Sequence, residues 1–141
     1  MNTRQILALA FVAGTCAASY AGGHAEWAGY PVEGVVYKFE VYTGLKDRWD
    51  STKQDAPPLA PGRALRAAKQ FISKVPLRED MKEWGLRDIT LQMLSPDEWV
   101  YVVHFDANPK SSVWNGPVPW IAVPVRMDGT IPKPEIERKK P

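Results

Sequence analysis

The sequence predicts an α+β protein in which one helix packs on an antiparallel sheet of three to five strands. Two observations lead to this fold class. Apolar residues recur at every second position in segment 35–42 and in several segments after Trp84, which is typical of half-buried strands. Between them, segment 61–75 carries apolar residues at helical spacing. One helix and several strands, each with one apolar face, bury those faces by packing as two layers.

The first 21 residues predict a cleavable signal peptide. Arg4 supplies positive charge, segment 6–16 is an apolar run, and Ser19 and Ala21 are small residues at the −3 and −1 positions of a cleavage site. The run is too short to span a bilayer as a helix, so we expect no membrane span. We therefore expect an exported protein, periplasmic or secreted, whose mature chain begins at Gly22.

The mature chain has a composition that limits its chemistry. Its 17 basic and 16 acidic residues nearly cancel, which gives no electrostatic case for binding nucleic acid or a membrane surface. The only cysteine, Cys16, lies in the signal peptide, so the mature chain has neither disulfide nor thiol chemistry. We expect a flexible N-terminal segment over 22–33, a single α+β domain over 34–136 and a frayed tail over 137–141.

The first half of this domain predicts a strand, a long connection and a helix. In segment 35–42 the apolar side chains fall on one face, while Lys38 and Glu40 fall on the other. Segment 44–61 is charged and rich in proline, which is typical of a connection. Pro61 suits the first turn of the following helix, and Pro76 ends it. Its apolar stripe predicts that Phe71 and Ile72 face the sheet, whereas Arg66 and Lys69 face solvent.

The second half predicts an antiparallel meander. Segments 88–93 and 99–106 alternate with period two, and Pro96 and Asp97 between them predict a type I turn. A third strand covers 121–127 and leads into the tight-turn pair Asp128-Gly129. Prolines at positions 132 and 134 remove two ladder donors, so segment 130–136 is either a short edge strand or an extended tail.

This order of elements resembles the cystatin-like folds, a helix and a curved sheet in two layers. The helix and the meander ending in Val125-Arg126-Met127-Asp128-Gly129-Thr130 also resemble small exported PepSY-type domains, over roughly residues 34–131. True cystatins inhibit cysteine proteases with a Gln-Val-Val-Ala-Gly-like first loop and a Pro-Trp second loop. The chain has Pro119-Trp120 but Ser95-Pro96-Asp97-Glu98 at the first loop, and this departure argues against protease inhibition.

The proline-rich loop before the third strand of the meander holds the candidate binding residues. Trp114, Asn115 and Trp120 lie in this turn-rich stretch, where aromatic side chains are displayed to a partner or fold back over the end of the core. We expect them to recognise a protein or peptide partner. The sequence contains no catalytic signature, so we do not expect an enzyme, and it leaves the oligomeric state open.

The alternative function is binding of Cu(II) or Ni(II) at the mature N-terminus, which would read Gly22-Gly23-His24. A free amine, two backbone amide nitrogens and a histidine ring at the third position close three chelate rings around a square-planar ion. This terminus resembles the amino-terminal copper and nickel motif of several exported proteins. If the protein instead binds a protein or peptide partner, we expect it to use no cofactor. A His104 and Asp106 pair on one strand face is interpreted as a solvated polar pair.

Overall fold

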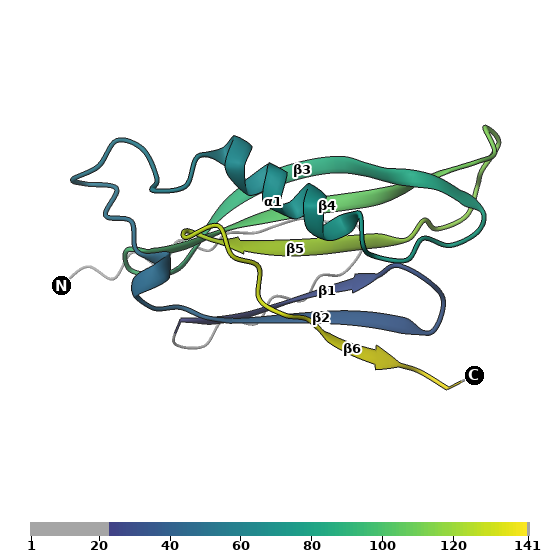
Figure 1. Cartoon of the computed structure of the whole chain (residues 1–141), viewed down its shortest axis with the longest axis horizontal. Helices are drawn as coiled ribbons and strands as arrows, with labels where there is room; N and C mark the ends of the chain where they lie inside the picture. Colours follow the sequence, from purple (N-terminus) through teal and green to yellow (C-terminus); the bar gives the residue numbers. More distant parts are fainter. Residues whose placement is uncertain (1–22, 141) are drawn as a thin grey trace.

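The computed structural model describes residues 23–140 (Figure 1). The predicted signal peptide over 1–21 and Gly22 lie outside these residues. Along the chain the elements are β1 (His24–Tyr30), β2 (Val35–Tyr42), the short 3-10 helix η1 (Leu45–Asp47), α1 (Pro61–Ile72), β3 (Met81–Ser95), β4 (Glu98–Pro109), β5 (Trp120–Arg126) and β6 (Glu135–Arg138).

The strands form one antiparallel six-stranded sheet in the order β3-β4-β5-β1-β2-β6. The fold is mostly sheet, with 46% strand and 13% helix, so the expected α+β class with three to five strands is wrong. Figure 1 shows α1 lying against the β4–β5 part of the sheet, with β1, β2 and β6 extending beyond it. The strand over 35–42, the long hairpin and the third strand of the meander are present at β2, β3–β4 and β5.

Strand β1 corrects the expected flexible segment over 22–33. Ala25, Trp27 and Gly29 are buried, while Glu26 and Tyr30 are exposed, which is the period of a half-buried strand. The strand is hard to see in the sequence because two of its three inward positions are small residues. Its partner β2 fixes it through six residue pairs, from His24↔Tyr42 to Gly29↔Tyr37.

Strand β6 corrects the expected frayed tail over 137–141. It pairs with the outer edge of β2, from Val35↔Arg138 to Lys38↔Glu135. The prolines at 132 and 134 precede the strand, so they remove no donor from this ladder. The chain stays attached beyond the strand, because the Lys139 amide donates a hydrogen bond of 2.7 Å to the Gly34 carbonyl oxygen.

The sheet has two halves, one formed by β3, β4 and β5 and the other by β1, β2 and β6, and they meet at one end. Strands β1 and β5 pair only at Gly29↔Ile121 and Tyr30↔Trp120. A Cβ atom at Gly29 would lie 2.3 Å from Ile121 Cγ1, so glycine permits the close approach of the two backbones. This join places Tyr30 and Trp120 side by side at the edge of the molecule.

The helix packs as its apolar stripe predicts. Ala64, Ala68 and Ile72 are buried, and the Phe71 ring meets the Phe39 ring edge-on with centroids 5.5 Å apart. Arg66 and Lys69 are exposed, which confirms the predicted rotation of the helix. No helix in the part of the chain from 23 to 140 is long and apolar enough to span a membrane.

The β3–β4 turn differs from the predicted type I turn. Asp97 has a φ of 60°, whereas the third residue of a type I turn has a negative φ. Ser95 pairs with Glu98 at one end of β4, while Trp120 pairs with Asp106 near the other end. The Ser95–Glu98 turn and the Pro119-Trp120 loop therefore lie at opposite ends of the β4 strand.

Candidate functional site

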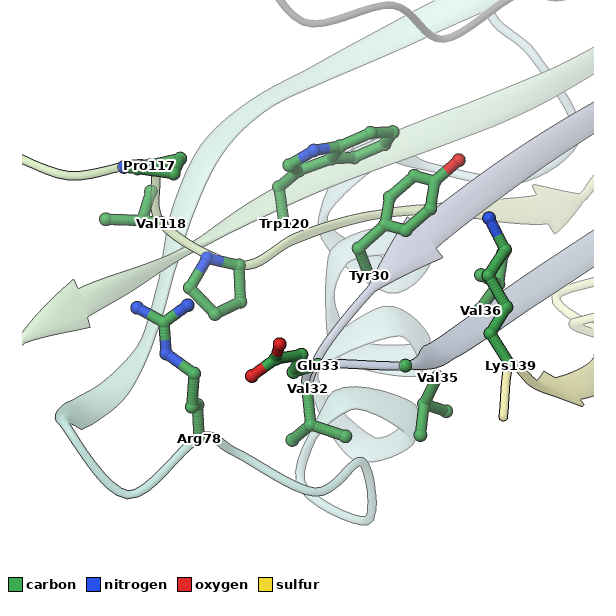
Figure 2. Close-up of a pocket in the computed structure, with 12 residues that line it drawn as sticks. Tyr30, Val32, Glu33, Val35, Val36, Arg78, Pro117, Val118, Trp120 and Lys139 are labelled. Carbon is green, nitrogen blue, oxygen red and sulfur yellow. The ribbon is translucent and has the colours of Figure 1, made fainter. Parts of the chain in front are cut away.

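A pocket of about 370 Å³ lies where β1 joins β5 (Figure 2). Four segments line it, the β1–β2 turn, the loop before β5, the connection from α1 to β3, and the residue after β6. The complete lining is Tyr30, Val32, Glu33, Gly34, Val35, Val36, Arg78, Pro117, Val118, Pro119, Trp120 and Lys139. The site thus gathers residues from both ends of the chain and from its middle.

The β1–β2 turn gives the pocket a fixed edge. The Val35 amide donates a 3.2 Å hydrogen bond to the Val32 carbonyl oxygen, and Gly34 has a φ of 73°, which favours glycine. A Cβ atom on Gly34 would lie 3.2 Å from the Lys139 carbonyl oxygen. The turn and the C-terminal segment therefore hold each other in place, with Lys139 beside the pocket.

Two aromatic rings form the apolar wall. Tyr30 and Trp120 face each other across the β1–β5 pair with ring centroids 5.1 Å apart and a tilt of 59° (Figure 2). Pro119 is buried beside them, and its carbonyl oxygen accepts a 2.9 Å hydrogen bond from the Ala107 amide. Tyr30 remains 43% exposed, so its ring is available to a ligand. The wall is a rigid, amphipathic surface of aromatic and proline rings.

Two cations border the pocket on different sides, with Arg78 near the prolines and Lys139 near Tyr30 (Figure 2). The Arg78 guanidinium binds the Asp80 carboxylate through two hydrogen bonds of 2.5 and 2.9 Å, and this pairing raises the pKa of Arg78 and lowers that of Asp80. The Lys139 ammonium has no ion-pair partner among residues 23–140. It is the cation of this pocket that is free to meet a carboxylate.

The predicted binding residues divide around this pocket. Trp120 lines it. Trp114 packs against Arg78, whose guanidinium carbon lies 5.3 Å from the indole centroid. The Trp114 Nε1 atom donates a 2.6 Å hydrogen bond to the Gly116 carbonyl oxygen. Asn115 is exposed and does not line the pocket. Sequence reasoning missed Tyr30, Arg78 and Lys139, because only long-range strand pairing brings these positions together.

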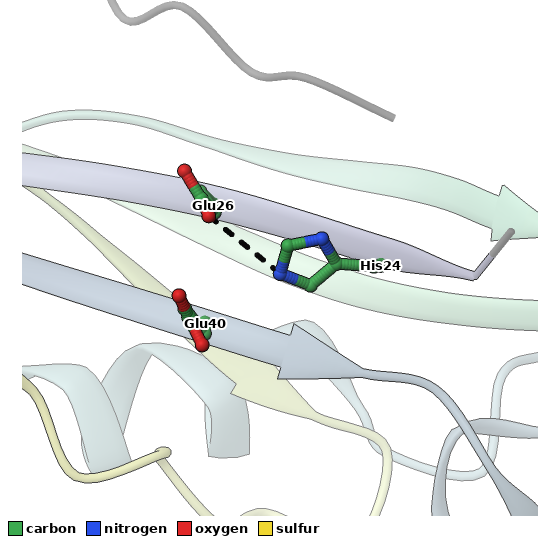
Figure 3. A group of neighbouring side chains, drawn as sticks. All are labelled: His24, Glu26 and Glu40. Atoms are coloured by element: carbon green, nitrogen blue, oxygen red, sulfur yellow. Dashed lines mark ion pairs between the residues drawn. The ribbon is translucent and has the colours of Figure 1, made fainter. Parts of the chain in front are cut away.

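The predicted metal-binding terminus lies at the start of β1. Gly22 is outside the described residues, so the Gly22-Gly23-His24 chelate stays a prediction. The Gly23 carbonyl oxygen accepts a 2.7 Å hydrogen bond from the Thr43 amide, and the His24 ring stacks on Tyr42. On the same sheet face, His24 lies near Glu26 and Glu40 (Figure 3). The sequence gives no local sign of this group, because only the pairing of β1 with β2 brings His24 and Glu26 next to Glu40.

His104 and Asp106 each have a partner from a bulge in β3. His104 Nδ1 lies 2.5 Å from Asp88 Oδ1, and Asp106 forms a two-bond ion pair with Arg87. The register shift between Leu86 and Asp88 brings these two partners onto the face that His104 and Asp106 share. Both side chains are therefore engaged in contacts within the sheet.

Comparisons with known proteins yield no match, because no family model, no curated protein and no solved structure is significantly similar to this chain.

Proposed function

We propose that this protein is an exported, non-catalytic binding domain that recognises a protein or peptide partner in the pocket between the β1–β2 turn and the Trp120 loop. The observation that carries the proposal is the pairing of the Tyr30 and Trp120 rings beside the Lys139 ammonium, which has no ion-pair partner within residues 23–140. Rigid aromatic residues at the centre of a contact surface supply most of the binding energy in many interfaces.

The chemistry of the lining favours an extended peptide segment. Paired aromatic and proline rings suit an apolar or proline side chain, as in grooves that bind polyproline-type segments. Lys139 suits a carboxylate, whereas the charge of Arg78 is offset by its ion pair with Asp80, and Glu33 disfavours a strongly acidic ligand. The expected motif therefore joins one apolar or proline residue to a single acidic residue a few positions away.

The lining also favours binding over catalysis. It holds no histidine, cysteine or serine, so it offers no nucleophile paired with an imidazole base. Arg78 is held by Asp80, and Glu33 lies at the exposed turn. Such a set orients a bound group by contacts and charge and has no evident acid–base pair.

Selection from a random peptide library tests the proposal. Peptides retained by the protein are measured by fluorescence polarisation against the wild type, Trp120→Ala and Lys139→Ala. We expect selected peptides to carry the apolar-plus-acidic motif. Each substitution should weaken binding by at least roughly tenfold, because a hydrogen bond to a charged group contributes about 1.5–3 kcal/mol and a central aromatic residue of an interface about 2 kcal/mol or more.

Lys133→Ala is the matched control, since Lys133 is exposed and does not line the pocket. It should bind like the wild type. Thermal melts of all variants separate lost binding from lost folding. If folded Trp120→Ala and Lys139→Ala bind the selected peptides as tightly as Lys133→Ala, the pocket is not the recognition site.

A further inference from the structure

The outer face of the β1–β2 hairpin brings three metal-ligand side chains together. Figure 3 shows His24 and Glu26 on β1 and Glu40 on β2, all pointing to the same side of the sheet. One ligand atom from each residue lies within 4.8 Å of the others. All three residues belong to strands, so the backbone that carries them is fixed by the β1–β2 ladder.

The register places the two glutamates directly opposite each other. Gly23 and Thr43 form a hydrogen-bonded pair, and such pairs alternate along an antiparallel ladder. Glu26↔Glu40 is therefore a non-hydrogen-bonded pair, the kind in which facing side chains come closest. Two like charges at such a position destabilise a sheet. A cation held between them would reverse the sign of this interaction.

His24 adds to the same place a ring nitrogen that has no hydrogen-bond partner among residues 23–140. Its Nε2 atom is buried and has no hydrogen-bond partner among the described residues. The nearest carboxylate oxygen, Glu26 Oε1, is 3.8 Å away, which is too long for a hydrogen bond. The ring is held in position by Tyr42, with ring centroids 4.3 Å apart and an interplanar angle of 17°. A buried polar atom without a partner is costly, and a metal ion would satisfy it.

The surrounding face is acidic. Lys38 is the cation of this part of β2, and its Nζ atom forms an ion pair with Glu137 Oε1 at 2.5 Å. Glu137 raises the pKa of Lys38, with smaller contributions from Glu135 and Glu26. Lys38 is thus shared among the β6 carboxylates and Glu26, so it offsets only part of the negative charge of the Glu26–Glu40 pair.

We propose that His24, Glu26 and Glu40 bind a divalent metal ion, with Zn(II) the ion that best suits one imidazole nitrogen and two carboxylate oxygens. Three protein ligands leave a fourth position open to water or to an exogenous ligand. Tetrahedral coordination needs ligand atoms roughly 3.4 Å apart, a distance that rotation of the two glutamate side chains can reach. This site shares only His24 with the terminal Gly22-Gly23-His24 chelate, and it is independent of the proposed peptide pocket.

Zn(II) titration of the full chain by calorimetry tests the site. Residues 1–21 precede Gly22 in this chain, so Gly22 has no free amine and the terminal chelate is unavailable. We expect one Zn(II) per chain. Residues that only support metal ligands change affinity by about 10–100-fold, so His24→Ala, Glu26→Gln and Glu40→Gln should each weaken binding by at least roughly tenfold.

Glu135→Gln is the matched control, because Glu135 is a carboxylate that also interacts with Lys38 but lies outside the cluster. It should bind Zn(II) within about twofold of the wild type, a change that corresponds to under 0.5 kcal/mol. The proposal is overturned if the wild type binds no Zn(II), or if Glu26→Gln and Glu40→Gln retain wild-type affinity.

Thermal melts provide the folding check. In a chelator, Glu26→Gln and Glu40→Gln should melt no lower than the wild type, because each removes like-charge repulsion. Added Zn(II) should raise the melting temperature of the wild type and leave these two variants nearly unchanged. An equal rise in all three proteins would place the metal elsewhere and overturn the assignment.

Discussion

Glu98 ties three segments together at the end of the sheet opposite the pocket. Its carboxylate accepts hydrogen bonds from the Ser95 hydroxyl and, at 2.6 Å, from the Thr43 hydroxyl. The Thr43 hydroxyl also lies 2.8 Å from the Gly23 carbonyl oxygen. A Cβ atom at Gly23 would lie 2.5 Å from this hydroxyl oxygen, so glycine keeps the contact possible. One carboxylate therefore links the β3–β4 turn to the start of the β1–β2 ladder.

This contact predicts a pH dependence of stability. The Ser95 and Thr43 hydrogen bonds lower the pKa of Glu98 below its ordinary value of 4.5. The unfolded chain then binds a proton more readily than the folded chain, so this contribution is present above pH 4.5 and is lost as the pH falls through the folded pKa. We expect Glu98→Gln to flatten the decline of the free energy of unfolding over this acidic range.

Urea unfolding of the wild type and Glu98→Gln, at intervals from neutral to acidic pH, measures the effect. Glu79→Gln serves as the control, because Glu79 is an exposed glutamate. Its acid limb should follow that of the wild type. An acid limb in Glu98→Gln as steep as that of the wild type would show that the Glu98 hydrogen bonds do not stabilise the fold.

At the scale of the elements, the pairing of β1 with β5 joins strands β3, β4 and β5 to strands β1, β2 and β6 in one continuous sheet. In the strand ladder itself, only the pairs Gly29↔Ile121 and Tyr30↔Trp120 join the two halves of the sheet. The aromatic wall of the pocket stands on the second pair. Any change that pushes β1 away from β5 should therefore affect stability and pocket geometry together.

Gly29→Ala tests this join. The new methyl group would lie 2.3 Å from Ile121 Cγ1 and 2.7 Å from Ile121 Cβ, so the strands must separate. Overpacking of this kind costs about 1–3 kcal/mol, and we expect a loss of that size in urea unfolding.

Gly62→Ala is the matched control for that substitution. Gly62 lies in the first turn of α1, and nothing lies within 4 Å of a Cβ atom at this position. Replacement should stabilise the protein by about 0.4–1 kcal/mol, because alanine reduces the entropy of the unfolded chain. If both alanine variants change stability alike, β1 does not approach β5 as closely as described.

Much of the element order is predictable from sequence periodicity. Val35–Tyr42 and the stripe of α1 have strong amphipathic patterns, and both match the structure. Strands β1 and β6 lack a local amphipathic pattern that would predict them. In β1 the inward positions Ala25 and Gly29 carry little apolar area, and β6 is a short edge strand whose partner lies about a hundred residues earlier in the chain.

The same limit applies to the candidate sites. Trp120 stands out as an aromatic residue in a proline-rich loop, so local sequence identifies it. Tyr30, Arg78 and Lys139 reach the pocket only through the β1–β5 join, the loop before β3 and the β6 pairing. Glu40 likewise meets His24 only when β1 and β2 are in register.

For the whole molecule, the two proposed sites lie on separate regions of one sheet. The pocket lies at the β1–β5 join, at the end of β1 that holds Tyr30, whereas the His24 cluster lies at the beginning of that strand. The pocket holds the Lys139 ammonium, whereas the cluster holds the facing carboxylates of Glu26 and Glu40. A partner bound at the pocket would leave the acidic face of the hairpin accessible.

The most direct test of the pocket is a two-dimensional NMR titration that follows the tryptophan indole N–H signals while a selected peptide is added. We expect the Trp120 indole signal to move most and Trp114 to respond through Arg78, while Trp84 and Trp99, whose indole nitrogens are buried, stay in place. Saturating shifts at Trp84 or Trp99 with an unmoved Trp120 signal would contradict recognition in this pocket.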